Sequence, residues 1–195
     1  MNHFEVFGLE RRLGIDAEAL QRRFYELSRR HHPDFHAGAT PGEQAEALEA
    51  SARLNAAYRT LRDPIARIDY LVRLEEGRET NEGSTDKPKA PPALLAEMFE
   101  IQEALAEAKS GGLDEPTRRT LAEQRERLLA RQGEEEARLT GPLSAAWDAA
   151  TTGGRPAILA AFKQALATRA YLRTVIEDVG QALNDGDEIV AHHRH

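Results

Sequence analysis

The chain has 195 residues, no cysteine and 33 acidic against 26 basic residues, which gives a net charge of −7. These values exclude disulfides and thiol catalysis and argue against a general nucleic-acid-binding protein. No stretch approaches the roughly 18 consecutive apolar residues of a membrane span, and the start of the chain resembles neither a secretory signal nor a transit peptide. We therefore expect a cytoplasmic protein of one or two domains.

The first strongly periodic segment predicts an amphipathic helix over 17–31. Asp16 is a candidate N-cap, and Leu20, Phe24 and Leu27 recur at the spacing of one buried helical stripe. Taken alone, a basic outer face is most often simply a solvated surface. The outer face of this helix carries four arginines: Arg22, Arg23, Arg29 and Arg30.

The sequence His32-Pro33-Asp34 follows this helix directly. Proline cannot continue a helix and pushes the preceding residue out of the α region, so the helix is expected to end near His31. The turn then presents an imidazole and a carboxylate. We expect no metal site at His31, His32, Asp34 and His36, because the proline turn splays these side chains and no cysteine or second ligand cluster accompanies them.

A long return helix is predicted over 41–62. Thr40 and Glu43 have the spacing of a capping box, with Pro41 at the first helical position. Asp63-Pro64 ends this helix and begins a short one over about 64–74. The apolar stripe of the return helix is typical of two antiparallel helices packed along their length: Ala47, Ser51, Leu54, Tyr58 and Leu61.

The segment 77–91 is polar and rich in glycine, threonine and proline, which is typical of a linker. Beyond it, helices are predicted over 92–109, 115–139 and from Pro156 to about 184, with a break at Gly141-Pro142. No segment shows the alternation of a β-strand, so we expect no sheet. The predicted divisions are a first domain (1–76), a linker (77–91), a three-helix bundle (92–185) and a tail (186–195).

The helix over 92–109 carries two apolar stripes, although a bundle requires one. The first should face the bundle core and consists of Leu94, Met98, Ile101 and Leu105. The second, Leu95 and Phe99, lies about 100° around the helix and is flanked by Glu100 and Glu103. This second stripe is open to three interpretations. It could be a partner-binding hot spot, it could widen the core stripe, or it could pack against the first domain.

Two further sequences lie along the return helix and its end: Asn55-Ala56-Ala57-Tyr58 and Leu61-Arg62-Asp63-Pro64. With the basic helix and the His-Pro-Asp turn, in this order, they resemble the J-domain of the DnaJ co-chaperone superfamily. The HscB branch is indicated by a helical bundle after the J-domain and by two sequences: Phe4-Glu5-Val6-Phe7-Gly8-Leu9 and Arg67-Ile68-Asp69-Tyr70-Leu71. The resemblance implies an all-α protein, with an N-terminal J-domain (an antiparallel helical hairpin with a His-Pro-Asp loop) and a C-terminal three-helix bundle.

The resemblance also implies two partners. The first is a DnaK-type chaperone, HscA, whose ATPase the J-domain stimulates; the second is its client, the iron–sulfur scaffold protein IscU, delivered during cluster assembly. The implied chaperone-binding residues are Arg22, Arg23, Arg29, Arg30, His32, Pro33 and Asp34. The implied client-binding residues are Leu95, Phe99, Glu100, Glu103 and Tyr171; Ala96 departs from the pattern, since a larger residue is frequent there.

We expect no enzymatic activity, because no convergent catalytic set appears in the sequence. We likewise expect no cofactor, no nucleic-acid or membrane partner, and a monomer. Two alternatives stay open. The chain could be a J-domain co-chaperone of the general DnaK chaperone with a different client, or a helical structural protein in which His-Pro-Asp occurs by chance.

Overall fold

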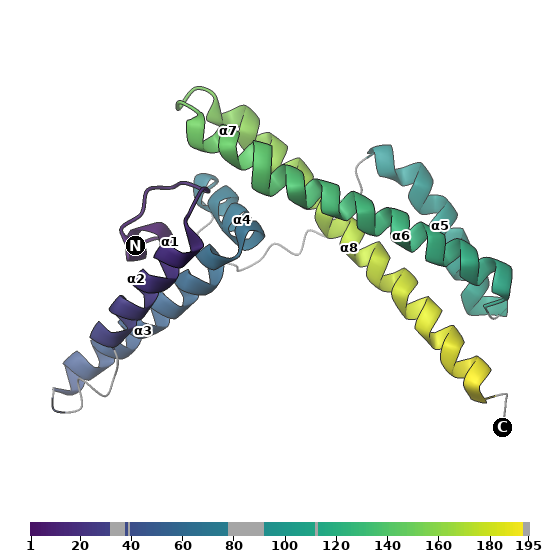
Figure 1. Cartoon of the computed structure of the whole chain (residues 1–195), viewed down its shortest axis with the longest axis horizontal. Helices are drawn as coiled ribbons and strands as arrows, with labels where there is room; N and C mark the ends of the chain where they lie inside the picture. The colour runs from purple at the N-terminus through teal and green to yellow at the C-terminus, as the bar shows by residue number, and fades with distance from the viewer. Residues whose placement is uncertain (32–37, 39, 78–91, 112, 193–195) are drawn as a thin grey trace. The chain divides into compact units, whose positions relative to one another are not determined.

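The structure is a computed structural model that describes residues 1–31, 38, 40–77, 92–111 and 113–192 (Figure 1). In this part of the chain every regular element is a helix, as predicted. The chain forms two compact units: unit 1, Met1–Asn81 with Thr140–Leu159, and unit 2, Glu82–Leu139 with Ala160–His195. None of the described helices is long and apolar enough to cross a membrane. The helices are α1 (His3–Phe7), α2 (Ala17–Arg30), α3 (Pro41–Arg62), α4 (Pro64–Glu75), α5 (Pro92–Gly111), α6 (Glu115–Arg138), the π-helix η2 (Leu139–Leu143), α7 (Ser144–Ala149) and α8 (Arg155–His192).

Capping residues set the bounds of the helices in unit 1, as the sequence predicts. The Asp16 side chain accepts a hydrogen bond from the Ala19 N–H at 2.9 Å, and α2 begins there. Thr40 and Glu43 form the predicted capping box at the start of α3. Asp63 caps α4 through the Ala66 N–H at 2.8 Å. Each cap satisfies an N–H that has no partner within its helix, which fixes where the chain turns helical.

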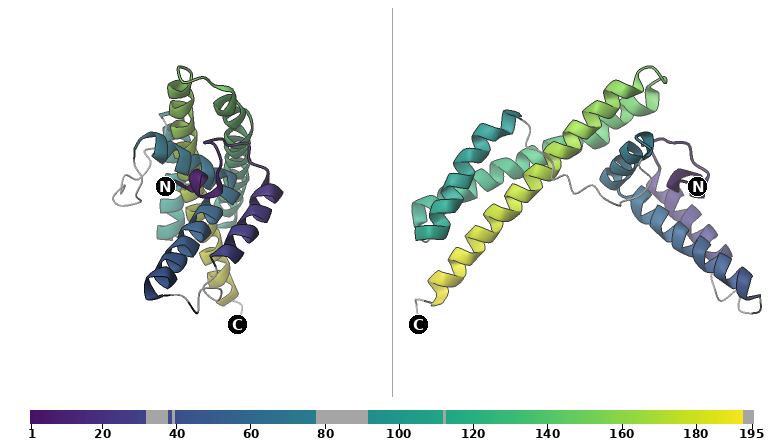
Figure 2. Two further views of the ribbon diagram at one scale, coloured as in Figure 1. Left: turned by 90° about the vertical axis from the view of Figure 1, so that its left-hand side faces the viewer. Right: turned by 180° about the vertical axis from the view of Figure 1, so that it is seen from behind.

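Helices α2 and α3 lie side by side and antiparallel in unit 1 (Figure 1, Figure 2). The rings of Phe24 and Tyr58 stack across this pair, with centroids 4.1 Å apart. Leu20 and Leu54 are buried, while Arg22 and Tyr25 on the opposite side of α2 are exposed. The hairpin therefore buries one stripe of α2 and leaves its basic surface to solvent.

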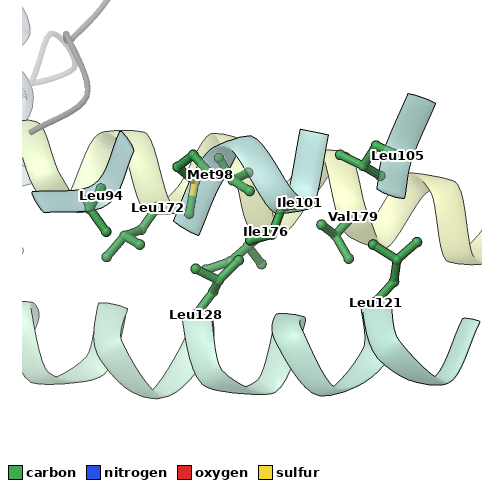
Figure 3. Close-up of a cluster of buried hydrophobic side chains, with 10 residues drawn as sticks. Leu94, Met98, Ile101, Leu105, Leu121, Leu128, Leu172, Ile176 and Val179 are labelled. Atoms are coloured by element: carbon green, nitrogen blue, oxygen red, sulfur yellow. The ribbon is translucent and has the colours of Figure 1, made fainter. Parts of the chain in front are cut away.

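In unit 2, α5, α6 and α8 share one hydrophobic core, which confirms the predicted three-helix bundle (Figure 3). All four residues of the predicted core stripe of α5 are at most 4% exposed. They pack with Leu121 and Leu128 from α6 and with Leu172, Ile176 and Val179 from α8. Burial of large aliphatic side chains is the main favourable term here, at about 1.5–3 kcal/mol for each fully buried side chain.

The predicted break at Gly141-Pro142 is wrong. Helical structure continues from α6 through η2 into α7, with Pro142 inside the π-helix. Proline lacks an N–H and crowds the preceding turn, and a wider π turn accommodates this without ending the helical run. The last helix is also longer than predicted, since α8 continues to His192 instead of ending near residue 184.

The division into units differs from the predicted domains in residues 140–159. The sequence places this segment in the domain 92–185, whereas in the structure Thr140–Leu159 belongs to the N-terminal unit. Hydrogen bonds show the reason. The Trp147 indole N–H donates to the Arg11 carbonyl at 3.2 Å, and the Asp148 carboxylate accepts from the Leu13 N–H at 2.8 Å. Partners so distant along the chain leave no local pattern in the sequence.

Candidate functional site

The exposed surface of α2 carries two stripes of arginine. Arg22 and Arg29 are one heptad apart and therefore lie on the same face, as do Arg23 and Arg30 on a neighbouring face. All four side chains are exposed, as the sequence predicts for a docking surface. The structure thus places Arg22 and Arg29 on the side of α2 opposite Leu20, and Arg23 and Arg30 on an exposed flank of the helix.

Two of these arginines form ion pairs within α2. Arg22 lies 3.5 Å from the Glu18 carboxylate, and Arg23 lies 3.1 Å from that of Glu26. Exposed pairs of this kind contribute about 0–1 kcal/mol, because water already solvates both charges. The guanidinium groups can therefore exchange these partners for carboxylates on another protein at little cost.

Tyr25 is the exposed aromatic side chain of this surface, and it was not among the candidate residues predicted from the sequence. It is 55% exposed and lies three residues after Arg22 and four before Arg29, on the same stripe. An aromatic ring between two guanidinium groups has the composition of an interface hot spot. Its helical spacing from the two arginines is visible in the sequence and could have identified it.

The His32-Pro33-Asp34 turn lies outside the described residues, so its role stays a prediction. The residues on either side of it are placed. His31 closes α2 through its N–H, which donates to the Leu27 carbonyl at 3.1 Å, and Thr40 opens α3. The turn therefore joins the end of the basic helix to the start of its return partner.

A groove of about 440 Å³ lies at this end of the hairpin, between His31, the C-cap of α2, and the first turns of α3. Its charged lining consists of Arg53 and three glutamates, Glu43, Glu46 and Glu49. The lining of this groove is therefore mainly acidic, in contrast to the arginine stripes along α2.

The second candidate surface lies on α5 in unit 2. Phe99 is 72% exposed, so it does not belong to the bundle core, and Glu100 and Glu103 are exposed beside it. The Leu95 side chain lies outside the described residues. Tyr171 lies on α8, partly buried against the bundle core. The structure thus offers an exposed aromatic ring flanked by carboxylates, while Tyr171 contributes at most part of its ring to any surface.

No group of three or more histidine, aspartate or glutamate side chains with the geometry of a metal site occurs among the residues that the structure places. The two surfaces consist of arginine, aromatic and carboxylate side chains on the outside of helices. This composition, with arginine and aromatic side chains, resembles that of protein–protein interfaces.

Comparison with known proteins identifies the N-terminal region. Residues 2–70 match the DnaJ domain family. The chain is 38% identical over 110 residues to a co-chaperone protein HscB homolog of Ralstonia nicotianae, covering 56% of this chain and 61% of that protein. It is 40% identical over 108 residues to the homolog of Bordetella petrii, covering 55% and 62%. The matched part thus spans less than two thirds of these relatives.

Solved structures extend the similarity to both units. Human co-chaperone protein HscB matches with a TM-score of 0.62 and 26% identity, over 93% of this chain and 81% of that one. Chaperone HscB from Vibrio cholerae matches with a TM-score of 0.51 and 24% identity, over 98% and 99%. At such identity the likeness concerns the fold. Residues 2–70 of the chain are therefore similar to the DnaJ domain, and the chain has the fold of the HscB co-chaperones.

Proposed function

We propose that this protein is a non-enzymatic co-chaperone of iron–sulfur cluster assembly. It stimulates the ATPase of a DnaK-type chaperone of the HscA kind and delivers an IscU-type scaffold protein to it. The observation that carries the proposal is the DnaJ domain over residues 2–70, in which His-Pro-Asp directly follows a helix with an exposed basic surface.

The chaperone-binding end of the proposal rests on α2 and the turn after it. A J-domain needs no catalytic group, because it accelerates hydrolysis by binding more tightly to the hydrolysis-competent arrangement of the chaperone. In the proposed complex Arg22, Arg29 and Tyr25 contact an acidic surface of the chaperone. Asp34 pairs with a chaperone arginine, since charge-assisted hydrogen bonds are among the stronger polar contacts.

The arginines are tested by steady-state ATPase measurements with an HscA-type chaperone. The double variant Arg22→Ala with Arg29→Ala is expected to raise the half-stimulating concentration several-fold at low salt. The difference from wild type should shrink as salt is added, because salt screens the attraction that speeds encounter. A matched control removes two exposed arginines from unit 2, Arg119→Ala with Arg127→Ala. If both double variants behave alike, the α2 surface is not the docking site.

The client-binding end of the proposal rests on α5. Phe99 is the most exposed phenylalanine among the described residues, and aromatic side chains are enriched at protein–protein interfaces. Glu100 and Glu103 beside it supply a polar rim that selects a partner with basic groups. Leu95 and Tyr171 complete the proposed client surface.

The client surface is tested by binding of a purified IscU-type scaffold. Phe99→Ala is expected to weaken binding by about 2 kcal/mol, or roughly thirtyfold in Kd, as loss of an aromatic anchor does. The same variant should leave client-free ATPase stimulation unchanged. Leu48→Ala is the matched control, since Leu48 is also large, apolar and 62% exposed but lies on α3. Scaffold binding that survives Phe99→Ala would show that this face is not the client site.

The same two measurements separate the proposal from a general J-domain role. A co-chaperone of the general DnaK chaperone would stimulate that ATPase and show no affinity for the scaffold. Stimulation of HscA together with scaffold binding supports the specialised function.

A further inference from the structure

The loop between α1 and α2 is held by the carboxylate of Asp148, which lies more than 130 residues later in the sequence. Both side-chain oxygens of Asp148 are used. Oδ1 accepts from the Leu13 N–H at 2.8 Å, and Oδ2 accepts from the Gly14 N–H at 2.7 Å. Asp148 lies on α7, in the segment Thr140–Leu159 that belongs to unit 1. Two hydrogen bonds from adjacent backbone N–H groups to one carboxylate fix the orientation of this loop more firmly than either would alone.

Arg67 holds the same loop residue from its other side. Its side chain is buried, at 6% exposed for the whole residue, and Nη1 donates to the Leu13 carbonyl. Burial lowers the pKa of Arg67, and the negative charges of Asp148 and Asp63 oppose this shift. Leu13 therefore has its N–H bonded to Asp148 and its carbonyl bonded to Arg67, and the charges of the two side chains complement each other.

Trp147 adds a third contact to the loop. The residue is 1% exposed, and its indole N–H donates to the Arg11 carbonyl at 3.2 Å. The Arg155 guanidinium lies 4.8 Å from the centre of the ring, within cation–π distance. The neighbouring residues Trp147 and Asp148 thus contact the loop at Arg11, Leu13 and Gly14.

The loop leads directly into the residue that starts α2. Asp16, two residues after Gly14, is the N-cap of the helix that carries the arginine stripes. The Ile15 N–H also bonds to the Leu13 carbonyl, so a tight turn over residues 13–15 leads directly into the cap at Asp16. The position of Leu13 and Gly14 therefore sets where α2 begins and how its first turn is oriented.

We propose that Asp148 is a positioning residue for the chaperone-binding surface of α2, acting through the backbone of Leu13 and Gly14. The residue itself contacts no part of that surface. This inference rests on the proposed function, because it assumes that α2 docks on a DnaK-type chaperone. On this proposal α7 contributes to the function of unit 1, although α7 and α2 lie far apart in the sequence.

The first test compares wild-type protein with Asp148→Asn in the full chain. Asparagine has one acceptor oxygen and no charge, so hydrogen exchange at the Leu13 and Gly14 amides, followed by NMR, is expected to become at least about tenfold faster. The half-stimulating concentration for the chaperone ATPase should rise several-fold while the maximal rate at saturation stays the same. A purely structural role would leave the half-stimulating concentration unchanged in a protein that remains folded. Asp178→Asn, an exposed carboxylate of unit 2, is the matched control.

The second test moves the carboxylate without altering it. A Cβ at position 14 would lie 3.0 Å from Asp148 Oδ2, so in Gly14→Ala that oxygen must shift by a few tenths of an ångström. The φ angle of Gly14 is not positive, and alanine itself is therefore tolerated there. Gly14→Ala is expected to reproduce the effects of Asp148→Asn, and the double variant should add nothing further. Gly153→Ala, whose Cβ would meet no atom within 4 Å, is the control.

The outcomes distinguish the inference from the function on which it rests. If wild-type protein stimulates no DnaK-type chaperone, the proposed function fails, and the positioning role fails with it. If wild-type protein stimulates but Asp148→Asn and Gly14→Ala leave the half-stimulating concentration unchanged, only the positioning role is overturned. Faster exchange at Leu13 and Gly14 with weakened stimulation in both variants supports it.

Discussion

His3 links the first turn of the chain to α4 by an aromatic stack. Its ring lies over that of Tyr70 with centroids 4.2 Å apart and an interplanar angle of 17°, and its backbone N–H donates to the Tyr70 hydroxyl at 2.9 Å. Partial burial lowers the pKa of His3, and the positive charge of Arg73 lowers it further. The folded state therefore favours the neutral imidazole.

This shift predicts a pH dependence of stability. The unfolded chain takes up a proton on His3 as the pH falls through 6.5, before the folded protein does. The free energy of unfolding should therefore decrease between about pH 7.5 and pH 5.5. His3→Phe keeps a planar ring on Tyr70 without a titrating group and should show a smaller decrease. Urea unfolding followed by fluorescence measures this, since Trp147 is the single tryptophan and lies in unit 1. Equal decreases in both proteins would contradict the assignment to His3.

The exposure of Phe99 was a question that the sequence left open, although the sequence did identify the core stripe of the same helix. The sequence placed Leu94 and Met98 in the core, and both are buried. It left the second stripe open between an exposed surface and a wider core, because periodicity gives the face of a helix but not what covers it. The exposure of Phe99 removes the wider-core alternative for this residue. The client-binding role of the surface stays a prediction.

The sequence predicted the starts of α2, α3 and α4 well, because capping signals are local. Asp16, Thr40 and Asp63 each cap the helix that the sequence assigned to them. The prediction failed at Pro142, where proline was taken to end a helix and instead lies within a π-helix. Whether proline ends a helix depends on how the next residues pack, and Trp147 packs against a loop far away in the sequence.

Two glycine-to-alanine substitutions test the helix assignments, because they should change the free energy of unfolding in opposite directions. Gly133 lies inside α6, and a Cβ there would meet no atom within 4 Å, so Gly133→Ala should stabilise the protein by about 0.5–1 kcal/mol. Gly8 closes α1 with a φ of 67°, so Gly8→Ala should be destabilising. Thermal unfolding followed by circular dichroism and by Trp147 fluorescence measures the two effects. A stabilising Gly8→Ala or a destabilising Gly133→Ala would contradict these assignments.

For the whole molecule, the sequence predicted the helical fold and the exposure of the α2 arginines but not the membership of residues 140–159. Asp148 bonds to Leu13 across 135 positions of the chain, and no composition or periodicity encodes such a pairing. Unit 1 includes Trp147 and Asp148, so the loop before its basic helix depends on the second half of the chain. This dependence has a functional consequence if α2 docks on a chaperone as proposed.

The two candidate surfaces belong to different units, α2 to unit 1 and α5 to unit 2. A client bound at α5 and a chaperone bound at α2 would be linked through one chain. Such a link raises the effective concentration of the client at the chaperone, commonly to the millimolar range, so weak client affinity suffices. Delivery and stimulation of hydrolysis are then coupled in a single adaptor.

The proposed stimulation of a DnaK-type ATPase depends on His32, Pro33 and Asp34. Its most direct test is the steady-state ATPase rate of an HscA-type chaperone with wild-type protein and with His32→Gln, each at saturating concentration and without client. We expect stimulation by wild-type protein and a rate near that of the chaperone alone with His32→Gln. Equal rates with the two proteins would contradict this role of the three residues.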